Sequence, residues 1–134
     1  MPTYKRFEDL PVWQDAVQLM VLVDRLTSEQ IFQRKRSYQD QLERATLSIS
    51  NNIAEGFERG TTKELLMFLY IARGSAGEVR SMCLVFERLP EFVHLKLQIS
   101  DLRKSTTAGQ GANLTSLTPT SSTPRALFCV RSIR

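Results

Sequence analysis

The spacing of the apolar residues constrains the fold of this chain more than any other feature. They recur at intervals of three and four residues, and the strict alternation that marks a half-buried strand is absent. The first such stripe consists of Val12, Ala16, Leu19, Val23 and Leu26. Spacing of this kind places apolar side chains on one face of a helix. The sequence therefore predicts an all-α protein.

Four segments share this spacing and are predicted to be helices. They cover about residues 10–27, 34–58, 62–89 and 91–104 or longer. Because the connections between them are short, we expect an antiparallel, up-down four-helix bundle over residues 1–117. Residues 118–134 are rich in Ser, Thr and Pro and are expected to form a flexible basic tail, disordered beyond the bundle.

Local signals place several of the helix ends. Pro11 is typical of a first turn, and Thr61 with Glu64 forms the pattern of a capping box. Gly60, directly before that box, is the expected stop of the second helix, and Pro90 that of the third.

Two glycines lie inside the third predicted helix. Gly74 and Gly77 each cost about 1 kcal/mol relative to alanine in a helix interior. They are either tolerated there or they allow a neighbouring helix to approach closely across Gly74, Ser75 and Gly77. The sequence leaves both interpretations open.

The composition excludes several classes of protein. No apolar run reaches the ~20 residues that span a bilayer, so we expect no membrane association. The first residues lack the apolar region of a secretory signal, which predicts a cytoplasmic location. Two cysteines, Cys83 and Cys129, and the single histidine, His94, are too few for a disulfide framework or a His/Cys metal site. We therefore expect no cofactor, no metal and no enzymatic activity.

The net charge of +4 is concentrated near the C-terminus. Residues 105–134 contain three arginines and no acid, which leaves a net charge of +1 on the remaining 104 residues. In that nearly neutral part, Arg34, Lys35 and Arg36 form the only basic run. These three residues, together with Arg103, Lys104 and the tail arginines, are our candidates for contacts with nucleic-acid phosphates. The alternative is that the run is a solvated turn or helix start.

A polar stretch interrupts the second predicted helix. Asn51 and Asn52 are poor helix formers at positions where the apolar spacing requires a helix. Such side chains form either a structural network between helices or a polar recognition surface, for instance for RNA. A third alternative is a divalent metal bound by Glu55, Glu58 and Glu78. Bundle metal sites of that kind use Glu-x-x-His pairs, which the chain lacks.

Three motifs occur in a specific order along the chain. They are Leu-x-Val-Trp at 10–13, Ser-Ile-x-x-Asn-Ile-Ala-Glu-Gly at 48–56 and Ile-Ala-x-Gly-Ser-x-x-Glu at 71–78. With them, residues 7–104 resemble the four-helix-bundle family named for 23S rRNA intervening sequences. The matching signature positions are Asn52, Glu55, Gly56, Arg59, Gly74, Ser75 and Glu78.

The resemblance implies a left-handed bundle that assembles into a homopentameric ring and a bacterial protein that is not an enzyme. A related branch comprises the accessory proteins of diversity-generating retroelements, which are basic pentamers that bind RNA and the reverse transcriptase. This chain departs from the family in two ways. Residues 105–134 replace a Leu/Ile-rich continuation of the last helix, and the body of the chain is nearly neutral.

Residue pattern and resemblance together predict a non-catalytic, oligomeric helical-bundle protein that serves as an RNA-associated accessory or scaffold protein. Its expected partners are further copies of itself, five by resemblance, and RNA. The alternative is a protein-binding adaptor with no nucleic-acid role.

Overall fold

The computed structural model describes residues 4–107, and all of its regular structure is helical. Four long helices pack together, and three short helical segments lie between or before them. The long helices are α1 (Pro11–Thr27), α3 (Arg36–Glu58), α4 (Thr62–Phe86) and α5 (Lys96–Thr107). The short segments are the 3₁₀ helices η1 (Phe7–Asp9) and η2 (Pro90–Leu95) and the α-helix α2 (Gln30–Arg34). The all-α prediction is confirmed, whereas the predicted tail lies outside the described residues.

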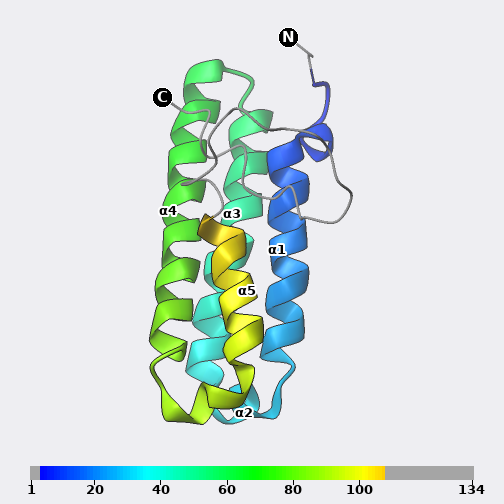
Figure 1. Cartoon of the computed structure of the whole chain (residues 1–134). Coiled ribbons are helices and arrows are strands. Elements are labelled where there is room, and N and C mark those ends of the chain that lie inside the picture. The colour runs from blue at the N-terminus through cyan, green and yellow to red at the C-terminus, as the bar shows by residue number, and fades with distance from the viewer. Residues whose placement is uncertain (1–3, 108–134) are drawn as a thin grey trace, which may run out of the picture.

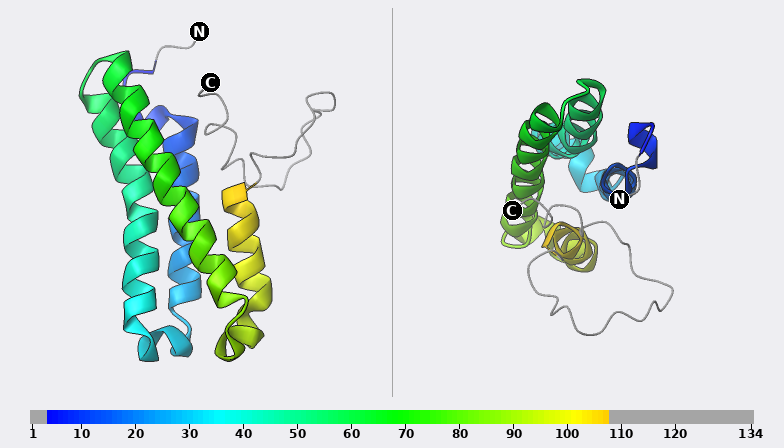
Figure 2. Two further views of the ribbon diagram at one scale, coloured as in Figure 1. Left: turned by 90° about the vertical axis from the view of Figure 1, so that its left-hand side faces the viewer. Right: turned by 90° about the horizontal axis from the view of Figure 1, so that it is seen from above.

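The long helices lie roughly side by side (Figure 1). In that view α1 and α4 run downward and α3 and α5 upward, while α2 lies at the lower end. The described part of α5 reaches about halfway up the bundle. Figure 2 shows α4 crossing obliquely, beside α3 at its start and beside α5 at its end. None of the helices in the described part of the chain has an apolar stretch long enough to cross a bilayer.

The core consists of the apolar stripes seen in the sequence. Its largest fully buried side chains include Phe32, Phe86 and Phe92, which meet at the α2 end of the bundle with ring centroids 4.9–5.5 Å apart. Full burial of one such side chain contributes about 1.5–3 kcal/mol. This aromatic cluster joins α2, α4 and η2, and so it closes the lower end of the molecule.

Two predicted helix starts differ from the structure. The second long helix begins at Arg36 rather than at 34, because the backbone of Lys35 leaves the helical region and separates α2 from α3. The segment after Pro90 begins as the 3₁₀ helix η2 and becomes α-helical only at Lys96. Neither short segment shows the repeated apolar spacing by which a long helix is recognised.

The turn between α3 and α4 follows the signals in the sequence. Gly60 has a φ of +79°, which favours glycine, and it follows the last turn of α3. The Thr61 hydroxyl accepts a hydrogen bond from the Glu64 backbone N–H at 3.2 Å and donates one to the Glu64 carboxylate at 2.6 Å. The N-cap hydrogen bond of the predicted capping box is therefore present, whereas the glutamate side chain binds the threonine hydroxyl instead of the Thr61 backbone N–H.

The close approach of two helices occurs at Gly56 and not at Gly74 or Gly77. A Cβ at Gly56 of α3 would lie 2.6 Å from the Phe68 Cβ of α4, whereas a Cβ at Gly74 or Gly77 would meet nothing within 4 Å. Of the two interpretations left open by the sequence, close approach of a neighbouring helix therefore does not apply to Gly74 or Gly77 within one chain. Only Ser75, which is buried, faces a neighbouring helix. The helices touch at Gly56 because α4 is nearest to α3 near its start.

Candidate functional site

Part of the polar stretch in α3 forms a chain of hydrogen bonds to α4. The Asn52 amide donates to the Ser48 backbone carbonyl at 2.7 Å and to the Ser48 hydroxyl at 3.0 Å. The Ser48 and Ser75 hydroxyls are 2.8 Å apart, and Ser75 donates to the Ile71 carbonyl at 3.3 Å. Either serine hydroxyl can be the donor in the bond between them. Two of the signature positions, Asn52 and Ser75, thus join the helices.

Two further signature residues lie at the end of α3. The Arg59 guanidinium is 2.7 Å from the Glu55 carboxylate and 3.9 Å from that of Glu64, and it lies 5.1 Å from the ring centroid of Phe68. These contacts connect the last turn of α3 to the first turns of α4. Since the side chains are half exposed, solvent screens each ion pair and its contribution to stability is small. The cluster positions the α3–α4 turn.

The signature positions do not converge on one site. Gly56 is buried against α4, whereas Gly74 and Glu78 are exposed on α4. Among residues 4–107, no group of three or more His, Cys, Asp or Glu side chains could hold a metal ion. The suggested cluster of Glu55, Glu58 and Glu78 is therefore not formed.

Of the basic run Arg34, Lys35 and Arg36 at the α2–α3 junction, only Lys35 forms an ion pair among the described residues. Lys35 pairs with Glu91 of η2 at 3.0 Å. The hydrogen bond to Glu91 raises the pKa of Lys35, and a backbone N–H together with the Lys35 ammonium lowers the pKa of Glu91. Arg34 and Arg36 are exposed, and neither pairs with a carboxylate among the described residues.

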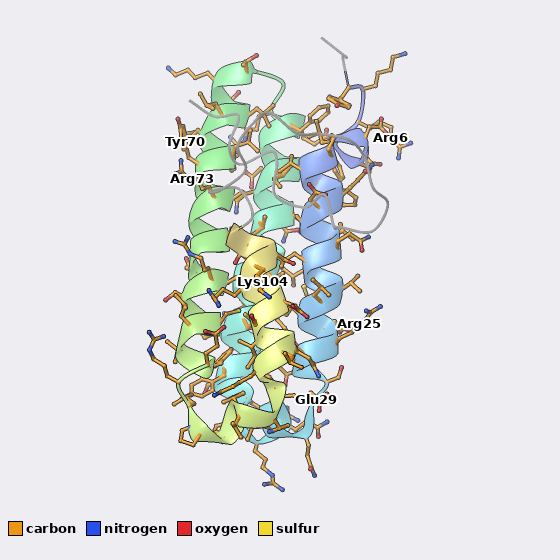
Figure 3. The ribbon with its side chains drawn as sticks, in the orientation of Figure 1. Arg6, Arg25, Glu29, Tyr70, Arg73 and Lys104 are labelled. Atoms are coloured by element: carbon orange, nitrogen blue, oxygen red, sulfur yellow. The ribbon has the colours of Figure 1, made fainter. Side chains whose placement is uncertain are left out.

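The two basic candidates of α5 are both in ion pairs. Arg103 lies 2.8 Å from Glu87, and Lys104 lies 3.8 Å from Asp101. Lys104 is labelled near the upper end of α5 in Figure 3, well above the α2 end of the bundle. The structure therefore does not join all five candidates into one basic patch.

Two residue types with catalytic potential are placed unfavourably for catalysis. Cys83 is fully buried in the core, and this burial raises the pKa of its thiol to about 12. His94 is exposed on η2. A neutral buried thiol is a poor nucleophile, because the thiolate is the reactive form.

A second stripe of residues lies on α4, opposite its buried face. Its members are Met67, Tyr70, Gly74, Gly77, Ser81 and Val85, which follow one another at intervals of three and four residues. Met67, Tyr70 and Val85 are 55%, 49% and 50% exposed, and beside them Ile71 is 47% exposed. Its spacing is present in the sequence, but half of the stripe is glycine and serine, so its residues do not form the apolar pattern by which a helix face is recognised.

Comparison with known families gives one finding. The family described as 23S rRNA-intervening sequence protein matches residues 8–105. The chain belongs to this family. The match covers the described bundle from η1 to α5 almost completely. The helical fold of the chain agrees with the intervening sequence protein family. No curated protein and no solved structure is significantly similar to the chain.

Proposed function

We propose that this protein is a non-catalytic accessory or scaffold protein that associates with RNA and with further copies of itself in the cytoplasm. The observation that carries this proposal is the family match over residues 8–105, because the family is named for a sequence within ribosomal RNA. The interior supports a non-catalytic role. Among the described residues it holds apolar side chains, and its only cysteine is a buried, neutral thiol.

Arg34 and Arg36 are the proposed contacts with RNA. Both guanidinium groups lie exposed at the α2 end of the bundle, and no carboxylate of residues 4–107 competes for them. A guanidinium that contacts a phosphate releases a counterion, which makes the affinity depend on salt. Each contact adds about 0.7 to the slope of log affinity against log salt for single strands. Self-association multiplies these contacts, because every copy presents the same pair.

Salt-dependent binding tests the proposal directly. The probe is a fluorescently labelled single-stranded RNA, and anisotropy is measured from about 50 to about 200 mM salt, where phosphate-driven affinity falls steeply. The variant Arg34→Gln with Arg36→Gln removes two charges at the α2 end. The matched control is Lys5→Gln with Lys63→Gln, which removes two exposed charges at the opposite end.

We expect the wild-type affinity to fall with salt and the arginine variant to lower the slope by about 1.4 per copy, twice the value of one contact. The lysine control should change the slope much less. If the two variants behave alike, Arg34 and Arg36 are not the contacts. Binding that is absent at low salt, or equal at low and high salt, would overturn RNA association and favour the adaptor.

A further inference from the structure

The charges of this nearly neutral bundle are separated between two of its sides. The helices α4 and α5 carry six basic and three acidic residues, whereas α1 and α3 carry three basic and six acidic residues. The end of α4 packs beside α5 (Figure 2), and α1 packs on α3. The bundle therefore has a positive α4–α5 side and a negative α1–α3 side, although the charges of the four helices cancel in total.

Two arginines form a row on the part of α4 that borders α5. Arg73, Arg80 and Glu87 follow one another at intervals of seven residues, so they lie on the same side of the helix. Glu87 comes directly after the last residue of α4 and binds Arg103 of α5 at 2.8 Å, which places this side of α4 toward α5. Two helical turns, about 10 Å, separate Arg73 from Arg80. Arg73 lies above the level that the described part of α5 reaches (Figure 3).

The positive charge of this row is not compensated by nearby carboxylates of the described residues. Arg73 is exposed and Arg80 is half-buried, and neither forms an ion pair with a carboxylate of residues 4–107. The Glu87 carboxylate is held by Arg103. Glu78 is the acidic residue of α4 closest to Arg80 in the sequence, but it lies about 200° around the helix from it.

A surface of this kind fits a polyanion. The planar guanidinium of arginine binds phosphate oxygens through parallel hydrogen bonds, which makes it the preferred side chain for phosphate recognition. Interfaces with nucleic acid are also much more positively charged than interfaces between proteins. The negative α1–α3 side repels phosphates, so the separated charges direct an approaching RNA toward α4 and α5.

We propose that RNA lies along the α4–α5 side of the bundle, with its phosphates on Arg73 and Arg80. This inference rests on the proposed association with RNA, and it adds a second contact surface to the one at Arg34 and Arg36. The competing occupant of a positive side is the negative α1–α3 side of another copy. RNA is favoured because the row consists of unpaired guanidinium groups, whereas the centre of a protein interface is depleted of charge.

Two double variants of equal net charge test the location of the contact. Arg73→Gln with Arg80→Gln removes two guanidinium groups from the positive side. The matched control, Arg25→Gln with Arg44→Gln, removes two exposed guanidinium groups from the negative side, and neither of these is in an ion pair among residues 4–107. None of the four side chains is buried, so urea unfolding should show wild-type stability for both variants.

Anisotropy of a labelled single-stranded RNA, measured from about 50 to about 200 mM salt, gives the number of phosphate contacts. We expect the Arg73 and Arg80 variant to lower the slope of log affinity against log salt by about 1.4 per copy. Its affinity then falls about sevenfold less than that of the wild type over this range of salt. The control should keep at least half of that difference from the variant, because it loses no contact. Equal slopes of the two variants would show that only the net charge matters and would overturn the inference.

The remaining outcomes separate this inference from the proposed function. A wild-type protein that binds no RNA at low salt would overturn the proposed function and this surface with it. RNA binding that is weakened by Arg34→Gln with Arg36→Gln, but not by Arg73→Gln with Arg80→Gln, would overturn only the α4–α5 surface. Light scattering without RNA tests the competing occupant. A smaller mass of the Arg73 and Arg80 variant, with RNA affinity unchanged, would show that another copy covers this side and would also overturn the inference.

Discussion

At the scale of single residues, the buried polar groups are few and each has a partner. Ser75 is 6% exposed, and its hydroxyl binds Ser48 across the helix interface and the Ile71 carbonyl on its own helix. No buried side-chain nitrogen or oxygen among the described residues lacks a hydrogen-bond partner. A buried hydroxyl without a partner costs about 1–3 kcal/mol. A sliding of α4 along α3 would separate the serines, so this pair fixes the register of the two helices.

Cys83 gives the protein a pH dependence whose sign follows from its burial. The pKa of its thiol rises from 9.0 to about 12 in the folded chain. The unfolded chain therefore releases this proton first as the pH increases. The contribution of the buried thiol to the free energy of unfolding is complete below pH 9.0 and is lost progressively between 9.0 and about 12.

We expect native Cys83 to resist alkylation. In a Cys129→Ser background at about pH 8, iodoacetamide should react with the folded protein at least a thousandfold more slowly than with the protein unfolded in urea, since the thiolate fraction alone falls by about that factor. Mass spectrometry of the alkylated chain gives both rates. Equal rates in the folded and the unfolded protein would show that Cys83 is not buried.

At the scale of helices, α4 is the element with two faces. Its inner face packs on α3 through Ser75 and Phe68, and its outer face carries the stripe from Met67 to Val85. The three glycines of α3 and α4 therefore differ in their surroundings. Gly56 lies against Phe68 and Leu65 of α4, whereas Gly74 and Gly77 face open space.

This difference predicts opposite effects of the same substitution. Gly56→Ala forces α3 and α4 apart and should lower the free energy of unfolding by about 1–2 kcal/mol after the gain in helix propensity. Gly74→Ala meets no atom and should raise it by up to about 1 kcal/mol. Urea unfolding at a concentration well below that of self-association measures both. A loss of stability in Gly74→Ala would contradict the open surroundings of that residue.

The long helices could be predicted because their apolar spacing repeats over several turns. Two other features depend on contacts between distant segments, and the sequence alone does not reveal them. The close approach of α3 to α4 depends on which glycine faces the neighbouring helix, and only the packing selects Gly56 over Gly74 and Gly77. The short α2 is held by Phe32, which packs on Phe86 and Phe92 from much later in the chain.

At the scale of the whole molecule, the number of basic residues in the sequence does not show which of them are available to bind RNA, because some form ion pairs within the fold. Lys35 pairs with Glu91, which is far from it in the sequence, and Arg103 of α5 pairs with Glu87 at the end of α4. Of the five candidates, only Arg34 and Arg36 are exposed without a carboxylate partner among residues 4–107. Most of the signature positions, among them Asn52, Gly56, Arg59 and Ser75, lie where α3 and α4 are joined.

We propose that this bundle acts by association with RNA and with its own copies. Light scattering on a size-exclusion column, with the absorbance ratio at about 260 and 280 nm recorded on the same peak, tests both parts of it. At low salt we predict a protein mass of a whole number of 15.3 kDa copies, more than one, together with excess absorbance from nucleic acid that disappears at high salt. A single 15.3 kDa species with the absorbance ratio of pure protein at low salt would contradict the account.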